Sequence, residues 1–195
     1  MTHAKEGYHH GDLRRAAIDS GLAMLRKRST DDLALREVAR SVGVSPTALY
    51  RHFPDKAAFL AALSEEGFER LGRAQLEAQA RVDAGVEGFH ATGRAYVDFA
   101  LANPALFRLM FSHGHPDALA NGHEGTAMGL LRANVEALAD PAHSGGEDEI
   151  RALCVHAWAL VHGLAVLLLD GQLPRDDALV TAAIDLRAML RRTGP

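Results

Sequence analysis

Apolar residues recur along most of this chain at intervals of three or four positions, which is the spacing of one face of an α-helix. Glycine, proline and short polar stretches interrupt the pattern. The interruptions separate expected helices over residues 11–28, 34–42, 46–53, 56–80, 88–102, 104–111, 117–140, 147–169 and 174–190. Alanine, leucine, arginine and glutamate are abundant and β-branched residues are sparse, which also favours helix. We therefore predict an all-α protein.

The most specific pattern is a pair of short helices joined by a tight turn at Gly43. Glycine adopts the left-handed backbone conformation that ends a helix without steric cost. Ser45 then offers a hydroxyl to cap the second helix, and Pro46 suits its first position. Leu49 and Phe53, four residues apart, form the inner face of that helix, and its outer side presents Thr47, Ala48, Tyr50, Arg51 and His52. Such a helix can enter and recognise a DNA major groove.

This stretch resembles the DNA-binding domain of the TetR family of bacterial transcription regulators. The resemblance covers about the first third of the chain and lies in Val44-Ser45, Leu49-Tyr50, His52-Phe53 and Lys56 at these spacings. Ala34 departs from the family pattern, which often has Ser or Thr there, so we expect one capping and phosphate contact to be missing. Further along, Trp158, His162 and Gly163 resemble the Trp-His-Gly pattern of one C-terminal domain class in the family.

The resemblance implies two helical domains. An amino-terminal arm and a three-helix DNA-binding domain with a helix-turn-helix would occupy residues 1–56, and a connecting helix residues 57–80. A larger helical domain for effector binding and dimerisation would occupy residues 81–195. The partners implied are double-stranded DNA with a pseudo-palindromic operator, a second copy of the chain and a small-molecule effector.

Carried over residue by residue, the family motif assigns DNA contacts of two kinds. Base edges would be contacted by Arg36, Pro46, Thr47 and Ala48, and phosphates by Ser45, Tyr50, His52 and Lys56. Arg51 suits either task, and Arg36 could instead form a salt bridge on the first helix of the motif. Phosphate contacts would supply affinity, and base contacts the choice of operator.

The net charge of −4 at first argues against nucleic acid, but its distribution reverses that conclusion. Residues 1–60 contain ten Lys and Arg against seven Asp and Glu, whereas the remainder contains eleven against eighteen. A basic amino-terminal module on an acidic body suits a protein with one end that meets phosphates. The first ten residues lack a signal-peptide core, and Cys154 is the only cysteine, so we expect a cytoplasmic protein without disulfides.

The expected helix over residues 147–169 is the most apolar part of the chain. Between residues 155 and 169 it has no charge, and only His156 and His162 are polar. We expect it to be too short to span a membrane, so that protein covers both sides, one of them in a second subunit. The predicted dimer contacts are Leu153, Ala157, Leu160, Leu164, Leu168, Leu179, Ala183, Leu186 and Leu190, with Gly163 permitting close approach of another helix.

Aromatic and methionine side chains of the larger domain are candidates for the wall of an effector cavity. They are Phe99, Phe107, Met110, Phe111, Met128, Leu131, Trp158 and His162. Such a wall suits a mainly apolar ligand of modest size. The alternative is that these residues are simply the core of the domain, and the resemblance identifies neither the effector nor its wall.

Eleven histidines raise the possibility of a metal or catalytic site. His113 could gather with His123 or His143 around a metal, but no Cys pair or His-Glu-x-x-His spacing supports this. Cys154 and His156 are two residues apart on a helix and so point in different directions. We therefore expect no metal, no cofactor and no enzyme activity.

The sequence thus predicts a ligand-responsive DNA-binding regulator, a repressor that its effector releases from the operator. One alternative is a regulator that needs no effector. Another, from a different class, is an enzyme that uses the histidine-rich helical domain. The sequence names neither the effector nor the target genes.

Overall fold

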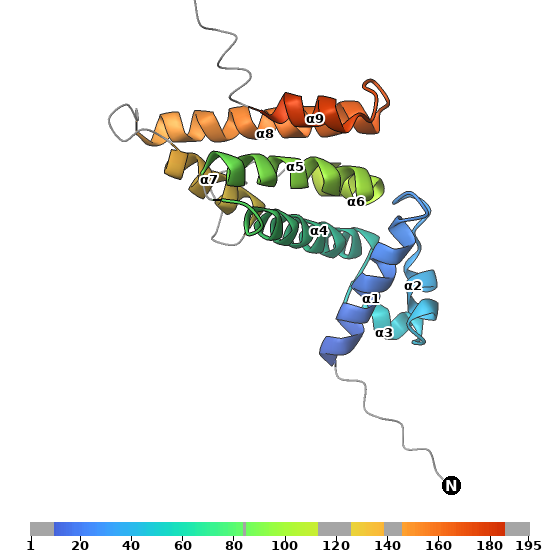
Figure 1. Ribbon diagram of the computed structural model, residues 1–195. Helices are drawn as coiled ribbons and strands as arrows, with labels where there is room; N and C mark the ends of the chain where they lie inside the picture. The colour runs from blue at the N-terminus through green and yellow to red at the C-terminus, as the bar shows by residue number, and fades with distance from the viewer. Residues whose placement is uncertain (1–9, 84, 113–125, 139–145, 186–195) are drawn as a thin grey trace, which may run out of the picture. The chain divides into compact units, whose positions relative to one another are not determined.

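The computed structural model describes residues 10–83, 85–112, 126–138 and 146–185, and the regular structure in these ranges is helical (Figure 1). The helices are α1 (His10–Leu25), α2 (Leu35–Ser41), α3 (Pro46–Tyr50), α4 (Lys56–Gln79), α5 (Val86–Ala102), α6 (Pro104–Ser112), α7 (Ala127–Leu138), α8 (Glu147–Leu169) and α9 (Asp177–Ile184). The predicted all-α fold is confirmed.

The described residues form two compact units. The first comprises residues 10–67 and 105–112, and the second the remainder. The helix α4 is continuous and contributes its first half to one unit and its second half to the other. The sequence pattern predicted such a shared helix. It also predicted that residues 104–111 belong to the larger domain, whereas α6 from Ala105 onward groups with the first unit.

The first unit packs α1, α2 and α3 with the start of α4. Its core side chains, none more than 1% exposed, are Ala17, Val38, Ala39, Leu49, Phe53, Phe59 and Leu63. The helices α1 and α4 approach closely at Gly21, where a Cβ atom would lie 2.6 Å from Cζ of Phe59. The Arg15 guanidinium Nη1 lies 2.9 Å from Glu66 Oε2, and this ion pair also ties α1 to α4.

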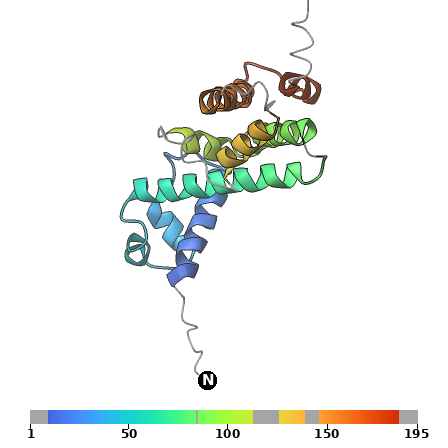
Figure 2. The ribbon, with the colours of Figure 1, turned by 90° about the vertical axis from the view of Figure 1, so that its left-hand side faces the viewer.

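The second unit places α8 and α9 against α5 (Figures 1 and 2). The core between these three helices consists of Val97, Leu164, Leu168, Val180 and Ile184. A second cluster joins α7 to α8 and consists of Val135, Ile150 and Cys154, with Phe89 and Leu131 packed against it. The unit is thus held together by two apolar clusters, both of which include α8.

The length of α8 does not support the expectation that this helix is too short for a membrane. It has 23 residues and is apolar enough to span one by length and composition, and 22% of its most apolar 18-residue window is buried. About 20 residues suffice to span a bilayer. One such helix is weak evidence for a membrane segment, because a helix that contributes one face to a protein core and another to a partner has the same composition.

Candidate nucleic-acid interface

The turn between α2 and α3 has the geometry that Gly43 predicts. Gly43 has a φ of +74°, the left-handed conformation that glycine adopts at no steric cost. The next amide, Val44 N–H, donates to the carbonyl of Ala39 at 3.0 Å and so closes the end of α2. Ser45 then caps α3, because its Oγ accepts a hydrogen bond from Ala48 N–H at 3.2 Å. These local interactions fix where α3 begins.

The inner face of α3 is anchored in the core of the first unit. Leu49 is fully buried and Phe53 is 1% exposed. The Phe53 ring packs edge-on against Phe59 with 4.9 Å between ring centroids, and the Arg14 guanidinium lies 5.6 Å above it. The helix is shorter than the predicted residues 46–53: it ends at Tyr50, and the chain continues through a turn to Phe53.

Most of the predicted DNA contacts, on α3 and on the segments around it, are exposed to solvent. The exposed ones are Arg36, Ser45, Pro46, Thr47, Tyr50 and Arg51, and the half-buried ones are Ala48, His52 and Lys56. Arg36 has no ion-pair partner among the described residues, so the alternative of a salt bridge on α2 is not observed there. All nine predicted contacts are therefore at least partly accessible to solvent.

Two local features near the start of α2 bear on phosphate binding. Ala34 is the N-cap of α2 and makes no side-chain capping bond, as its departure from the family pattern predicts. Lys56 Nζ donates to the backbone carbonyl of Asp31 at 2.9 Å. Since an ammonium group has three donors, Lys56 can hold this loop and still bind a phosphate.

Comparison with known families identifies the chain. Residues 89–188, about half of its length, match the model described as "Tetracyclin repressor-like, C-terminal domain". The chain belongs to the TetR family. Residues 17–63, which include the α2–turn–α3 surface, match the family model "Bacterial regulatory proteins, tetR family". The chain is therefore a TetR-family transcriptional regulator. The finer assignment to the Trp-His-Gly class is not confirmed by these matches.

Individual relatives agree with this assignment. An uncharacterized HTH-type transcriptional regulator from Haemophilus influenzae is 33% identical over 98 residues, which are 50% of this chain and 48% of that protein. The chain thus matches about half the length of this curated relative. A solved protein of unknown function from Rhodococcus sp. RHA1 is 33% identical, with a TM-score of 0.75 and coverage of 95% and 96% of the two chains. A TetR-family regulator from Streptomyces coelicolor shares the fold, with a TM-score of 0.65, 20% identity and coverage of 92% of this chain and 79% of that one.

The structure divides the predicted effector residues between the two units. Phe107, Met110 and Phe111 belong to the first unit, where a Cβ atom on Gly67 would lie 2.7 Å from Met110 Sδ. The second unit contains Phe99, Met128, Leu131, Trp158 and His162. Phe107 and Met110 are buried as the core alternative predicts.

Trp158 and His162 meet through Tyr96, a residue that sequence analysis missed. Tyr96 Oη lies 2.9 Å from His162 Nδ1, and Trp158 Nε1 donates to the same Oη at 3.3 Å. Burial raises the pKa of Tyr96 above its usual value and lowers that of His162, so both are neutral near pH 7. Because neutral His162 can accept at Nδ1, the three groups form one hydrogen-bonded chain on α5 and α8.

The predicted dimer contacts lie on two sides of α8 and α9. Leu153 and Leu179 are 40% and 38% exposed, whereas Leu164 and Leu168 are 7% and 1% exposed and lie in the core of their own unit. Ala157 and Leu160 are half-buried, and Ala183 packs partly against the same core. Leu186 and Leu190 lie outside the described residues.

The alternative metal and catalytic residues are not brought together in the parts of the chain that are described. Cys154 is buried and burial raises its pKa, whereas His156, two residues on, is exposed. His113, His123 and His143 lie outside the described ranges. Within those ranges no three His, Cys, Asp or Glu side chains are placed to hold a metal ion.

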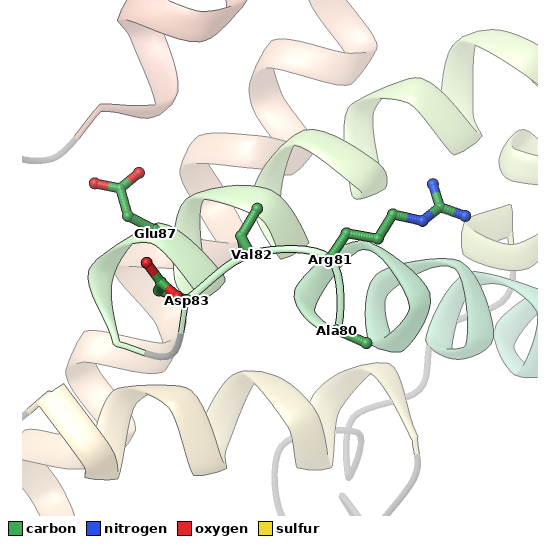
Figure 3. Close-up of a pocket in the computed structure, with 5 residues that line it drawn as sticks. All are labelled: Ala80, Arg81, Val82, Asp83 and Glu87. Atoms are coloured by element: carbon green, nitrogen blue, oxygen red, sulfur yellow. The ribbon is translucent and has the colours of Figure 1, made fainter.

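A surface hollow lies where α4 gives way to α5 and is shown in Figure 3. Its walls are Ala80, Arg81, Val82, Asp83 and Glu87. The Arg81 side chain extends away from the Asp83 and Glu87 carboxylates (Figure 3). The hollow is open and polar, unlike the apolar, enclosed sites that drug-sized ligands occupy.

Proposed function

We propose that this regulator is a repressor that binds a pseudo-palindromic operator as a homodimer and leaves it when a small, mainly apolar effector binds. The observation that supports DNA recognition most directly is the surface of α3. Leu49 and Phe53 fix its inner face, while Thr47, Tyr50 and Arg51 remain accessible on its outer side. A rigid helix with exposed hydroxyl, phenol and guanidinium groups can enter a major groove.

We expect phosphate and base contacts to respond differently to substitution. Tyr50→Phe, His52→Ala and Lys56→Ala should weaken binding to all sequences similarly, each changing the log–log salt slope by about one unit at most. Thr47→Ala and Arg36→Ala should instead relax the preference at particular base pairs. Fluorescence anisotropy against operator variants at several salt concentrations measures both effects.

Thermal melting controls for folding, above all for Lys56→Ala, because that side chain also holds the carbonyl of Asp31. If both groups of variants changed salt slope and base preference in the same way, the division into phosphate and base contacts would be wrong.

The second copy is proposed to cover the exposed apolar side of α8 and α9. The exposed apolar side chains include Leu153 and Leu167, which share one side of α8, and Leu179 of α9, each between 38% and 43% exposed. TetR-family regulators usually bind DNA as dimers. A dimer would present two α3 helices to successive major-groove faces, which explains why a pseudo-palindromic operator is proposed.

Effector release would then be a coupling between two binding equilibria. The effector binds the second unit, and DNA binds when the two α3 helices have the correct separation. An effector that prefers another separation lowers DNA affinity by no more than the ratio of its affinities for the two states. An effector-independent regulator would lack this coupling, so screening compounds for loss of operator binding separates the two possibilities.

Trp158 is expected to report on the effector. It is the only tryptophan, and its N–H donates to Tyr96 Oη in the second unit. Trp158→Phe removes one hydrogen bond, typically worth about 1 kcal/mol, so folding and operator binding should survive while effector affinity falls. In the wild type, the emission should shift when a releasing compound is added.

Fluorescence titration, with affinity measured separately for the Phe variant, decides the role of Trp158. Equal effector affinity for both proteins, together with unchanged emission, would make Trp158 part of the core and not of the site.

A further inference from the structure

Four residues with polar side chains, from three helices, form two hydrogen-bonded pairs inside the second unit. Gln75 and Gln79 come from α4, Thr92 from α5 and Asn134 from α7. Gln75 Nε2 donates to the carbonyl of Thr92 at 3.2 Å, and Gln79 Nε2 donates to Asn134 Oδ1 at 2.9 Å. Gln75, Thr92 and Asn134 are all at least nine-tenths buried. We call these four residues the amide cluster.

Two atoms of the amide cluster are buried and have no hydrogen-bond partner within the described ranges: Gln75 Oε1 and Asn134 Nδ2. An unsatisfied buried polar group costs about 1–3 kcal/mol, so native proteins rarely keep one without a reason. The orientation of the Gln75 amide is determined by Thr92, because a backbone carbonyl only accepts. Turning the amide over would bring two acceptors together. Gln75 therefore offers an acceptor.

Gln79 connects the two residues that carry the unsatisfied groups. Gln75 and Gln79 are four residues apart and lie on the same face of α4, about one turn from each other. Gln79 in turn holds Asn134. Two apolar residues lie close in sequence to the cluster and pack against the core of Val135, Ile150 and Cys154. They are Phe89, whose carbonyl accepts from Thr92 Oγ1 at 2.8 Å, and Leu131, which lies three residues before Asn134 on α7. Both are only partly buried.

We infer that Gln75 and Asn134 are the polar recognition site of the effector. This inference rests on the proposed function only in calling the ligand an effector. The chemical class of the ligand is argued from the two amide side chains. The ligand is a compact apolar molecule with a neutral donor and a neutral acceptor on one group, as in a primary carboxamide. Its N–H donates to Gln75 Oε1 and its carbonyl accepts from Asn134 Nδ2. A carboxylate has no donor for Gln75 Oε1 and would leave that atom unsatisfied.

Benzamide is the probe of choice, because it joins this group to an apolar ring. Calorimetric titration of the full chain without DNA should show binding of benzamide, with benzoate and acetamide at least about tenfold weaker. Gln75→Met and Asn134→Leu keep the side-chain volume and remove one partner each. Each should weaken benzamide binding about tenfold or more, because the ligand group left behind is buried without a partner.

Gln172→Leu is the matched control, because it removes an exposed amide from the same unit. It should leave the affinity for benzamide unchanged. In an ¹⁵N-labelled sample, the side-chain NH₂ signals of Gln75 and Asn134 should shift on adding benzamide, and that of Gln172 should not. Melting curves confirm that the variants are folded.

Several results would overturn the proposed site. They are absence of benzamide binding up to its solubility, binding unaffected by both cluster variants, and a preference for benzoate. Failure of the proposed function has a different signature. If benzamide binds, needs both Gln75 and Asn134, and leaves operator affinity unchanged, the ligand site is upheld and effector release is overturned.

Discussion

Replacing Phe53 by alanine is expected to abolish operator binding through loss of the fold of the first unit. The ring is 1% exposed, packs against Phe59 and lies beneath the guanidinium of Arg14. Phe→Ala in a core typically costs about 3–5 kcal/mol, a large part of the roughly 5–15 kcal/mol that holds a domain folded. The inner anchor of α3 would be lost with it.

Circular dichroism melting and operator titration together measure this effect. Tyr50→Ala is the matched control, because Tyr50 lies on the same short helix but is 43% exposed. It should shift stability by about 0.5 kcal/mol or less while it weakens DNA binding. An unchanged melting temperature and intact operator affinity in Phe53→Ala would show that burial of this ring does not position α3.

Gly163→Leu is expected to give a folded monomer with greatly weakened operator binding. Among the described residues, nothing lies within 4 Å of a Cβ at Gly163, so a side chain can begin there without a clash in its own subunit. If a partner helix approaches there, the leucine overpacks that contact, which typically costs about 1–3 kcal/mol at each copy. Losing the dimer removes the second half-site and with it an avidity gain of about 10²–10⁴.

Sedimentation velocity gives the oligomeric state, and anisotropy gives the operator affinity. Gly163→Ala adds only one methyl group and should remain dimeric, with a helix that is more stable by about 0.5–1 kcal/mol. A Gly163→Leu protein that sediments as the wild-type dimer would place the partner helix elsewhere on the exposed side of α8.

Local signals explain why the geometry of α2, the turn and α3 could be predicted so closely. The turn conformation of Gly43, the cap from Ser45 and the burial of Leu49 each depend on residues a few positions away. Spacing along the sequence therefore predicts them. The same holds for α8, whose bounds agree with the expected residues 147–169. The end of α3 was less predictable. Phe53 is buried and lies four residues after Leu49, as in a helix, but the chain reaches it through a turn.

The second unit was harder to predict because periodicity shows that a helix has an apolar face but not which neighbour covers it. α8 is apolar on both sides, so the sequence alone could not separate Leu168, buried in its own core, from the exposed Leu153. The pairing of Gln79 with Asn134 likewise joins residues 55 positions apart.

By itself, the sequence determined the all-α fold, the family and the residues of the α2–turn–α3 surface, because these follow from local conformational preferences and short spacings. Only the tertiary structure decided which apolar side of α8 stays open, that Tyr96 links Trp158 to His162, and that Gln75 and Asn134 are buried with unsatisfied atoms. Those features arise from packing between distant helices. Burial there removes polar groups from water, so the free-energy cost of each group depends on whether it finds a hydrogen-bond partner.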